Sequence, residues 1–375
     1  MTDKSRPDYQ LLLVVAILVA IGIVMVYSAS AMVGDERHES TIYFFKRQLL
    51  WFIMAFPVML LAMRLDYHIF QKISLPLLVI SLAFLVAVLL RPPMNNVRRW
   101  IRFGPLGFQP SELFRFAFIL FLSYSLSKRL EKIKEFKYLL IPYFPLLAVG
   151  FLLIIKEPDL GTALTIGLTG ILLLFIAGAK LRHLALVILP ALAVIFFLVF
   201  GLGYEKERID DYFKSLKDPL AGSYQLKQSV LSLGSGGLWG VGLGEGKQKL
   251  LFLPEPHTDF ILANMGEEGG FALLAATLTL FLILGWRGFK IAFKAQDYFG
   301  FFLAFGITSA IMFGFIMNAC VISGILPTTG LPSPFLSYGG TSLFLNLLAI
   351  GVLLNISRQR HNYKESKVVG KSSLW

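Results

Sequence analysis

Ten apolar stretches divide this chain of 375 residues, and each is long enough, or nearly long enough, to cross a lipid bilayer as a helix. Hydrophobic residues make up 56% of the chain and charged residues only 15%. A soluble domain carries roughly a quarter charged residues. The sequence therefore predicts an all-α polytopic membrane protein. The predicted spans lie near residues 10–32, 46–64, 73–90, 112–127, 138–155, 160–179, 183–203, 260–285, 299–322 and 341–356.

The distribution of lysine and arginine predicts the orientation of these spans. With the N-terminus in the cytoplasm, most basic residues of the short loops fall on the cytoplasmic side, as the positive-inside rule requires. Both termini are then cytoplasmic, and one large extracytoplasmic loop, 204–258, joins the seventh and eighth spans. The predicted organisation is a single ten-helix membrane domain over 1–357 and a basic cytoplasmic tail over 358–375.

The net charge of +12 favours contact with anionic lipid headgroups over nucleic acid in a chain of this class. Local charge is more informative. Arg98, Arg99 and Arg102 lie in an outward loop, where basic residues oppose the orientation rule. They indicate either a bound anionic ligand or a loop that contacts headgroups, and the segment alone does not separate the two.

Acidic residues begin two of the spans. Glu112 lies in the first turn of the fourth span with Arg115 three residues later on the same face, which a capped helix with a local ion pair explains. Asp159 suits the N-terminus of the sixth span, and capping explains it too. Capping does not explain why Lys156 and Glu157 crowd the same short turn.

The large loop and a later segment are rich in turn-forming residues. Apolar residues recur at helical spacing over 205–220, which predicts an amphipathic helix on the bilayer surface. The glycine run 234–246 is either an anion-binding nest or a flexible loop. Prolines and glycines in 324–340 predict an irregular segment that dips into the membrane inside the protein, and Asn318 before it needs a polar partner.

The large loop ends in a motif, 253–260, that contains His257 and Asp259. A carboxylate at the edge of a hydrophobic body is a functional candidate, although Asp259 is equally placed to cap the eighth span. For His257 an exposed loop position is the simpler interpretation. Glu267 and Glu268 follow inside the span, where adjacent side chains point about 100° apart. We expect one of them to contact the site and the other to stabilise the fold.

Seven of these segments together resemble the SEDS family (shape, elongation, division and sporulation), which includes FtsW and RodA. They occur in family order over nearly the whole chain: Arg98-Arg99-Trp100-Ile101, Gln109-Pro110-Ser111-Glu112, Pro158-Asp159-Leu160-Gly161-Thr162, Gly234-Ser235-Gly236-Gly237, 253–260, Glu267-Glu268 and 332–340. Lys247-Gln248-Lys249 and Gly178-Ala179-Lys180 look more like FtsW than RodA. The chain departs from the family at Glu157, usually glutamine, at Arg115, usually lysine, and at Asn95-Asn96-Val97.

The resemblance implies a multi-pass protein of the bacterial inner (plasma) membrane that polymerises lipid II into peptidoglycan strands for septal or elongation synthesis. It implies Asp259 as the general base, an outward-facing active site and release of undecaprenyl pyrophosphate. The residues we expect to bind substrate are Arg98, Arg99, Arg102, Glu112, Arg115, Asp159, Lys249, His257, Glu268 and Ser337. A divalent cation (Mg²⁺ or Mn²⁺) bridging pyrophosphate to carboxylates is compatible with this chemistry, but no metal-ligand spacing predicts one.

The implied partners are a class B penicillin-binding protein, which is a transpeptidase, and other membrane proteins of the divisome or elongasome. Two other functions fit a helical membrane body of this kind. A lipid II flippase also needs charged residues at membrane depth and broken helices, and a non-catalytic scaffold would only recruit the transpeptidase. The clustering of unusual residues on the outward side favours chemistry on that side.

Overall fold

The computed structural model describes residues 6–93, 97–103, 106–201, 203–218, 222–249 and 254–359. Residues 360–375, most of the predicted basic tail, lie outside the described residues, as do Asn95, Asn96 and residues 250–253. The described part is almost entirely helical, which confirms the predicted class. Its only strands in the described ranges are β1 (Ile101–Phe103) and β2 (Leu106–Phe108), an antiparallel hairpin in which Arg102 pairs with Gly107.

Every predicted span overlaps a helix. These helices are α1 (Tyr9–His38), α2 (Tyr43–Arg64), α3 (Ile69–Leu89), α4 (Pro110–Arg129), α5 (Phe136–Lys156), α6 (Leu160–Ile176), α7 (Leu181–Phe196), α10 (Ile261–Phe293), α11 (Tyr298–Ile322) and α12 (Gly340–Arg358). A 3₁₀ turn, Leu130–Lys134, follows α4, and a π-helical turn, Phe197–Gly201, extends α7. Within the described residues, seven of these helices (α1, α2, α3, extended α7, α10, α11 and α12) are long and apolar enough to cross a membrane. The count of ten spans stays a prediction.

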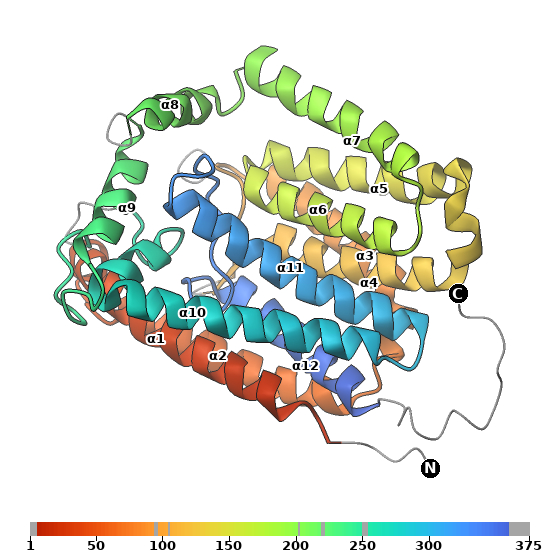
Figure 1. Cartoon of the computed structure of the whole chain (residues 1–375), viewed down its shortest axis with the longest axis horizontal. Helices are drawn as coiled ribbons and strands as arrows, with labels where there is room; N and C mark the ends of the chain where they lie inside the picture. Colours follow the sequence, from red (N-terminus) through yellow and green to blue (C-terminus); the bar gives the residue numbers. More distant parts are fainter. Residues whose placement is uncertain are drawn as a thin grey trace.

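The long helices run side by side, with α11 between α10 and α6 (Figure 1). The helices differ in how far the protein buries them. In the most apolar 18-residue stretch of each helix, 78% of α11 and 83% of α12 are buried, compared with 17% of α7. In Figure 1, α7 lies at the edge of the molecule, next to α5 and α6. The core is therefore formed around α11, α12 and α4, and α7 keeps most of its apolar surface outside the protein.

The predicted amphipathic segment is helical. Helix α8 (Lys206–Lys217) forms within 205–220 and leaves Phe213 and Leu216 more than half exposed. Helix α9 (Tyr224–Ser235) follows and packs on α10. That α8 lies on a bilayer surface stays a prediction.

Helix α10 bends at Gly270, whose φ of 63° and ψ of −167° place it in a region that side-chain-bearing residues rarely adopt. The glycine run lies against this bend. Gly236 and Gly240 lie very close to the backbone of α10. A Cβ on Gly236 would lie 1.9 Å from the carbonyl oxygen of Gly266, and a Cβ on Gly240 would lie 2.1 Å from that of Glu268. Gly236 and Gly240 therefore permit close contact with α10, and the anion-binding nest that the sequence left open stays a prediction.

The segment between α11 and α12 has no regular secondary structure and is largely buried, as predicted for a chain that dips into the protein interior. Leu331, Phe335 and Leu336 have at most 2% of their surface exposed. Its backbone also approaches α1, because a Cβ on Gly22 would lie 2.2 Å from the carbonyl oxygen of Phe335.

Candidate functional site

Asp259 lies at the end of the large loop, immediately before α10. The N-cap of this helix is Phe260, with no side-chain cap hydrogen bond, so the alternative interpretation of Asp259 as the cap is wrong. The Asp259 backbone is held from α11: the Asn318 side-chain amide donates to the carbonyl oxygens of Asp259 and Leu331, at 2.7 Å each. This confirms that Asn318 has polar partners, and it leaves the Asp259 carboxylate free of a capping role.

Arg99 is the cation next to this carboxylate. A Cβ on Gly330 would lie 3.4 Å from Arg99 Nη1 and 3.5 Å from Asp259 Oδ2. Both side chains therefore border the same small space next to the Cα of Gly330. Arg99 is half-buried and its Nε donates to the carbonyl oxygen of Glu157 at 3.1 Å. The turn between α5 and α6 thus orients the guanidinium, and two of its nitrogens stay available to a ligand.

Asp159 lies close to Arg99 and Asp259 and links two helices. Its Oδ1 accepts from the Thr162 amide at 3.2 Å and caps α6, as the sequence predicted, and its Oδ2 accepts from Gln109 Nε2 at 3.0 Å. Gln109 is the N-cap residue of α4, and Asp159 is only 1% exposed. Asp159 therefore joins α4 to α6 and places a second negative charge near Arg99.

The pKa of Asp259 reflects this environment. Burial raises it to about 6, Arg99 lowers it, and Asp159 and Glu255 raise it. Asp259 is only partly buried, so solvent or substrate reaches it. At neutral pH the group is a carboxylate with a pKa close to the surrounding pH, which is the condition for an effective general base.

Glu157 is the most unusual group near the site. Its side chain is fully buried, and neither carboxylate oxygen has a hydrogen-bond partner among the described residues. Burial, reinforced by Asp159, raises its pKa from 4.5 to about 9, while Arg99 lowers it. Glu157 is therefore neutral at pH 7, where it resembles the glutamine that the family usually has.

We expect Glu157→Gln to leave the activity of the protein unchanged at pH 7 and to raise its melting temperature by a few degrees at pH 8. Between pH 4.5 and 9 the unfolded carboxyl loses a proton that the folded one keeps, so the stability of the wild type falls as pH rises. Glutamine removes this loss. Thermal unfolding of the wild type and the variant at pH 8 and at the lowest pH that both tolerate measures this effect. A difference in melting temperature that does not shrink towards acid pH would contradict the raised pKa of Glu157.

Arg98, Arg99 and Arg102, the arginines of the predicted outward loop, have different surroundings in the structure. Arg98 Nη1 donates to the carbonyl oxygen of Leu89 at 3.0 Å, at the end of α3, and the side chain is exposed. Arg102 is exposed on β1 and contributes positive charge near Tyr338. Only Arg99 borders the space beside Asp259, so the three arginines are not equivalent.

Glu112 and Arg115 form a buried ion pair of 2.7 Å within α4, and Arg115 Nη2 also donates to Asn346 of α12 at 3.1 Å. Glu112 is 1% and Arg115 7% exposed. They line a small cavity between α4, α11 and α12. This confirms the predicted local ion pair, and among the described residues no hydrogen bond or ion pair joins it to Asp259.

His257 and Ser337 are packed inside the protein. His257 is 1% exposed, and its ring centroid lies 4.3 Å from that of Phe44. The exposed-loop interpretation is therefore wrong, because this loop folds under α2 and Tyr338. Burial lowers the pKa of His257 to about 4, so it is neutral at pH 7. Ser337 accepts a hydrogen bond from the Ser333 amide at 2.8 Å, and this bond shapes the segment before α12.

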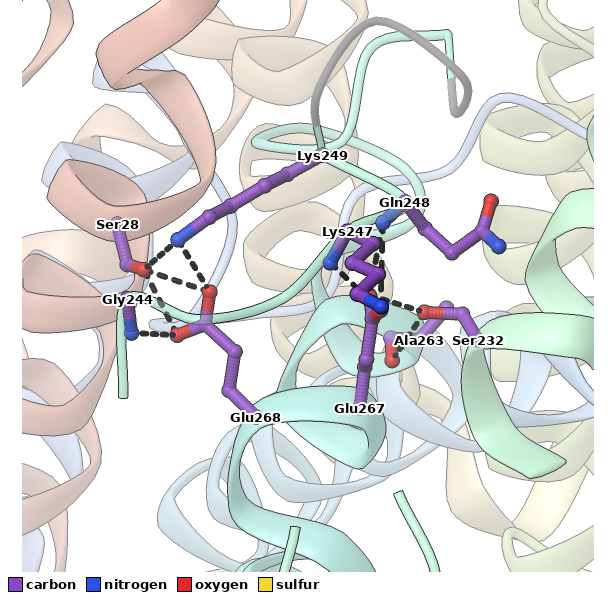
Figure 2. Close-up of polar contacts among 9 residues, drawn as sticks. All are labelled: Ser28, Ser232, Gly244, Lys247, Gln248, Lys249, Ala263, Glu267 and Glu268. Carbon is purple, nitrogen blue, oxygen red and sulfur yellow. Dashed lines mark hydrogen bonds and ion pairs between the residues drawn. The ribbon is translucent and has the colours of Figure 1, made fainter. Parts of the chain in front are cut away.

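Lys249 and Glu268 contact each other. Lys249 Nζ lies 2.7 Å from Glu268 Oε1, and both side chains are buried (Figure 2). Ser28, one of two serines in the apolar helix α1 and passed over by sequence reasoning, bonds to both. Gln109, Gln48 and Asn346 were likewise missed as contacts, because an isolated polar residue in an apolar run does not indicate its partner.

The described residues contain no cluster of three or more histidine, cysteine, aspartate or glutamate side chains arranged to hold a metal ion. Asp259 and Asp159 are instead accompanied by Arg99. The residues in place therefore do not form a resident metal site, and we derive no step of the chemistry through a metal.

Comparison with known proteins identifies close relatives. Residues 9–362 match the model of the family FtsW/RodA/SpoVE, described as a cell cycle protein. A relative from Geobacter sulfurreducens, named "Probable peptidoglycan glycosyltransferase FtsW", is 43% identical over 359 residues, 95% of this chain and 96% of the relative. Stage V sporulation protein E of Bacillus subtilis is 41% identical over 361 residues, 95% of this chain and 98% of the relative.

Solved structures show the same fold. A chain from a peptidoglycan synthase complex that coordinates polymerization and crosslinking superposes with a TM-score of 0.77 at 27% identity, covering 95% of this chain and 99% of that one. The rod shape determining protein RodA of Thermus thermophilus gives a TM-score of 0.70 at 27% identity, covering 95% and 98%.

Proposed function

The chain belongs to the FtsW/RodA/SpoVE family of cell cycle proteins and is a peptidoglycan glycosyltransferase, and on this premise we propose that Asp259 is its general base. The observation that carries this role is the pairing of a partly buried carboxylate, with a pKa near 6, and a half-buried guanidinium around one small space. A glycosyl transfer with a pyrophosphate leaving group needs both a proton acceptor and a positive charge.

We infer that the substrate is lipid II and that the reaction is a displacement at its anomeric carbon. The acceptor hydroxyl oxygen forms a bond to that carbon while its proton passes to Asp259. The bond from the anomeric carbon to the phosphate oxygen breaks, and its electron pair leaves with undecaprenyl pyrophosphate. Arg99 stabilises the charge that develops there, because a fixed cation in a partly desolvated site acts strongly on it. Arg98 and Arg102 are our candidates for contacts farther along the substrate.

We infer a topology with ten spans, cytoplasmic termini and the loop 204–258 outside. The helical chain and its family indicate a multi-pass membrane protein. We infer the bacterial inner membrane from the family, and an outward-facing active site is supported by the distribution of basic residues and by the place of Asp259 at the end of that loop.

We infer that the partner is a class B penicillin-binding protein, a transpeptidase, together with other division or elongation proteins. The support is the likeness to a chain from a complex that coordinates polymerization with crosslinking. The FtsW name of several relatives favours septal synthesis over elongation.

The pH dependence of kcat/KM tests the base. Asp259 must be ionised to accept a proton, and its pKa in the free protein is raised to about 6. We therefore expect kcat/KM to rise as pH increases through 6 and to reach a plateau near 7, because kcat/KM reports the ionisation of the free enzyme. Initial rates with lipid II well below its KM from pH 5 to 8 measure this profile. A profile that stays flat down to pH 5 would exclude a base with this pKa.

The purified protein in detergent with lipid II tests the function as a whole, because detergent offers no membrane to transport across. We expect glycan chains that disappear in the Asp259→Asn variant. A flippase would yield no chains under any condition. A non-catalytic scaffold would also yield no glycan chains when the transpeptidase partner is added and no other polymerase is present. In cells, such a scaffold would still support growth after Asp259 is replaced.

A further inference from the structure

Two adjacent carboxylates inside α10 have no role in the chemistry above. Glu267 and Glu268 are each 2% exposed and occupy the last turn before the bend at Gly270. In Figure 2 their side chains point in different directions, as adjacent helical residues do. Both nevertheless bind the same stretch of chain, residues 244–249 of the large loop.

Glu267 binds the backbone of this stretch. Its Oε1 accepts from the Lys247 amide at 2.7 Å, and its Oε2 accepts from the Gln248 amide at 3.2 Å and from the Ser232 hydroxyl at 3.3 Å (Figure 2). A buried carboxylate that receives several hydrogen bonds is well stabilised as an anion. Glu267 thereby fixes the path of two consecutive residues of the loop and ties it to α9.

Glu268 binds the end of the stretch. Its carboxylate accepts from Lys249 Nζ at 2.7 Å, from the Ser28 hydroxyl at 2.7 Å and from the Gly244 amide at 3.1 Å. Lys249 Nζ also donates to Ser28 Oγ at 2.9 Å. These contacts join three parts of the chain that are distant in sequence: α1, the large loop and α10 (Figure 2).

Backbone hydrogen bonds extend the same attachment. The Val241 and Gly242 amides donate to the carbonyl oxygens of Glu267 and Glu268 at 3.0 and 3.1 Å. On the other side of the bend, the Phe271 amide donates to the Gly237 carbonyl at 2.9 Å. The loop is thus fastened to α10 from residue 237 to residue 249, and Asp259 follows ten residues later, one residue before the N-cap of the same helix.

The contacts of Lys249 leave little for a substrate. The side chain is 6% exposed, and its ammonium group already has two acceptors. Among the described residues, no hydrogen bond or ion pair joins Lys249 or Glu268 to Asp259. A buried ion pair gives little net stability after desolvation, so its use for holding one geometry is the better explanation.

We propose that Lys249 and Glu268 are a positioning pair: together with Ser28 they hold residues 244–249 of the loop to α10, the helix that Asp259 directly precedes, and so set the place of the catalytic carboxylate without contacting lipid II. This inference rests on the proposed role of Asp259. It replaces the substrate-binding role that the sequence predicted for these two residues.

Steady-state kinetics of polymerisation separate the two roles. The variants are Lys249→Met, Glu268→Gln and their combination, each full-length and assayed over a range of lipid II concentrations. A positioning role predicts that kcat falls at least tenfold while KM for lipid II stays within twofold, because the substrate contacts remain. The double variant should lose no more than the more affected single variant, since either change removes the same ion pair.

Lys247→Met is the matched control. It removes the same charge two residues away, its side chain is exposed, and its contact with Glu267 uses only the backbone amide. We expect both kinetic constants to stay within twofold of the wild type. Lys249→Arg keeps a cation that reaches Glu268 and should recover more of kcat than Lys249→Met.

Three results would overturn the proposal: a KM raised tenfold with kcat unchanged, which indicates a lipid II contact; additive losses in the double variant; or wild-type kinetics in both single variants. Melting temperature and elution volume in detergent show that each variant is folded, and Glu268→Gln, which conserves volume, serves if Lys249→Met does not fold. Asp259→Asn assayed in parallel distinguishes a failure of the proposed general base from a failure of the positioning pair. Activity in that variant would refute the base, whereas a raised KM in Lys249→Met would refute only the positioning pair.

Discussion

The Asp259→Asn variant is expected to polymerise lipid II at least about 100-fold more slowly than the wild type, which is the lower end of the contribution of a general base. Asparagine keeps the shape of the side chain and cannot accept the proton. The hydrogen bond from Asn318 reaches the backbone carbonyl of residue 259, so it survives the change. Initial rates of glycan formation at pH 7 measure the effect.

Glu255→Gln is the matched control for this experiment. It removes a carboxylate from the same motif, one that is 44% exposed and paired with Arg37 at 3.0 Å. We expect its rate to stay within a few-fold of the wild type. If Asp259→Asn retained more than a tenth of wild-type activity, another group would have to be the base.

Replacement of Arg99 by glutamine should lower kcat by about 100-fold, the usual loss on removing one preorganised group that stabilises developing charge. Arg98→Gln removes the same charge from the neighbouring position, where the side chain is exposed and bonds to the end of α3. We expect kcat of this control to fall less than threefold, because a contact of Arg98 farther along the substrate would act on KM and not on the chemical step. Equal losses in the two variants would mean that the arginines act only as a diffuse positive field.

The pH profile of Arg99→Gln provides a second readout that loss of structure would not produce. Arg99 lowers the pKa of Asp259 in the free protein, so its removal should raise that pKa and move the acid limb of kcat/KM to higher pH. The comparison requires the residual activity of the variant from pH 5 to 9. A limb that stays at pH 6 would separate Arg99 from the base.

Hydropathy was sufficient to predict the helices, because a bilayer leaves few alternatives for apolar stretches of this length. The helical segment 206–217 and the irregular segment before α12 also follow from spacing and from proline and glycine content. Motif resemblance indicated Asp259, and the structure adds Arg99 beside it. These predictions share a cause: each depends on local sequence.

The predictions that failed concern contacts between distant segments. His257 looks like a loop residue in the sequence, yet it is buried by Phe44 of α2 and by Tyr338, 81 residues further on. The substrate-binding role predicted for Lys249 and Glu268 stays a prediction, but their direct contact at 2.7 Å and the hydrogen bonds of Ser28 in α1 to both were likewise not foreseen from the sequence. Tertiary pairing of charges has no signature in one sequence, so these assignments needed the structure.

Helix α7, with 17% of its most apolar window buried, has a consequence for how the enzyme is studied. Neighbouring helices cover little of α7, so in a membrane we expect acyl chains to surround most of it and its tilt to respond to the thickness of the bilayer as well as to its few helix contacts. Beyond α7, the Tyr204 hydroxyl donates to the Ile155 carbonyl at 3.0 Å, two residues before Glu157, whose carbonyl oxygen binds Arg99. The thickness of the surrounding bilayer thus becomes a variable of the catalytic centre, and bilayers of short and long chain lipids are not interchangeable hosts for it.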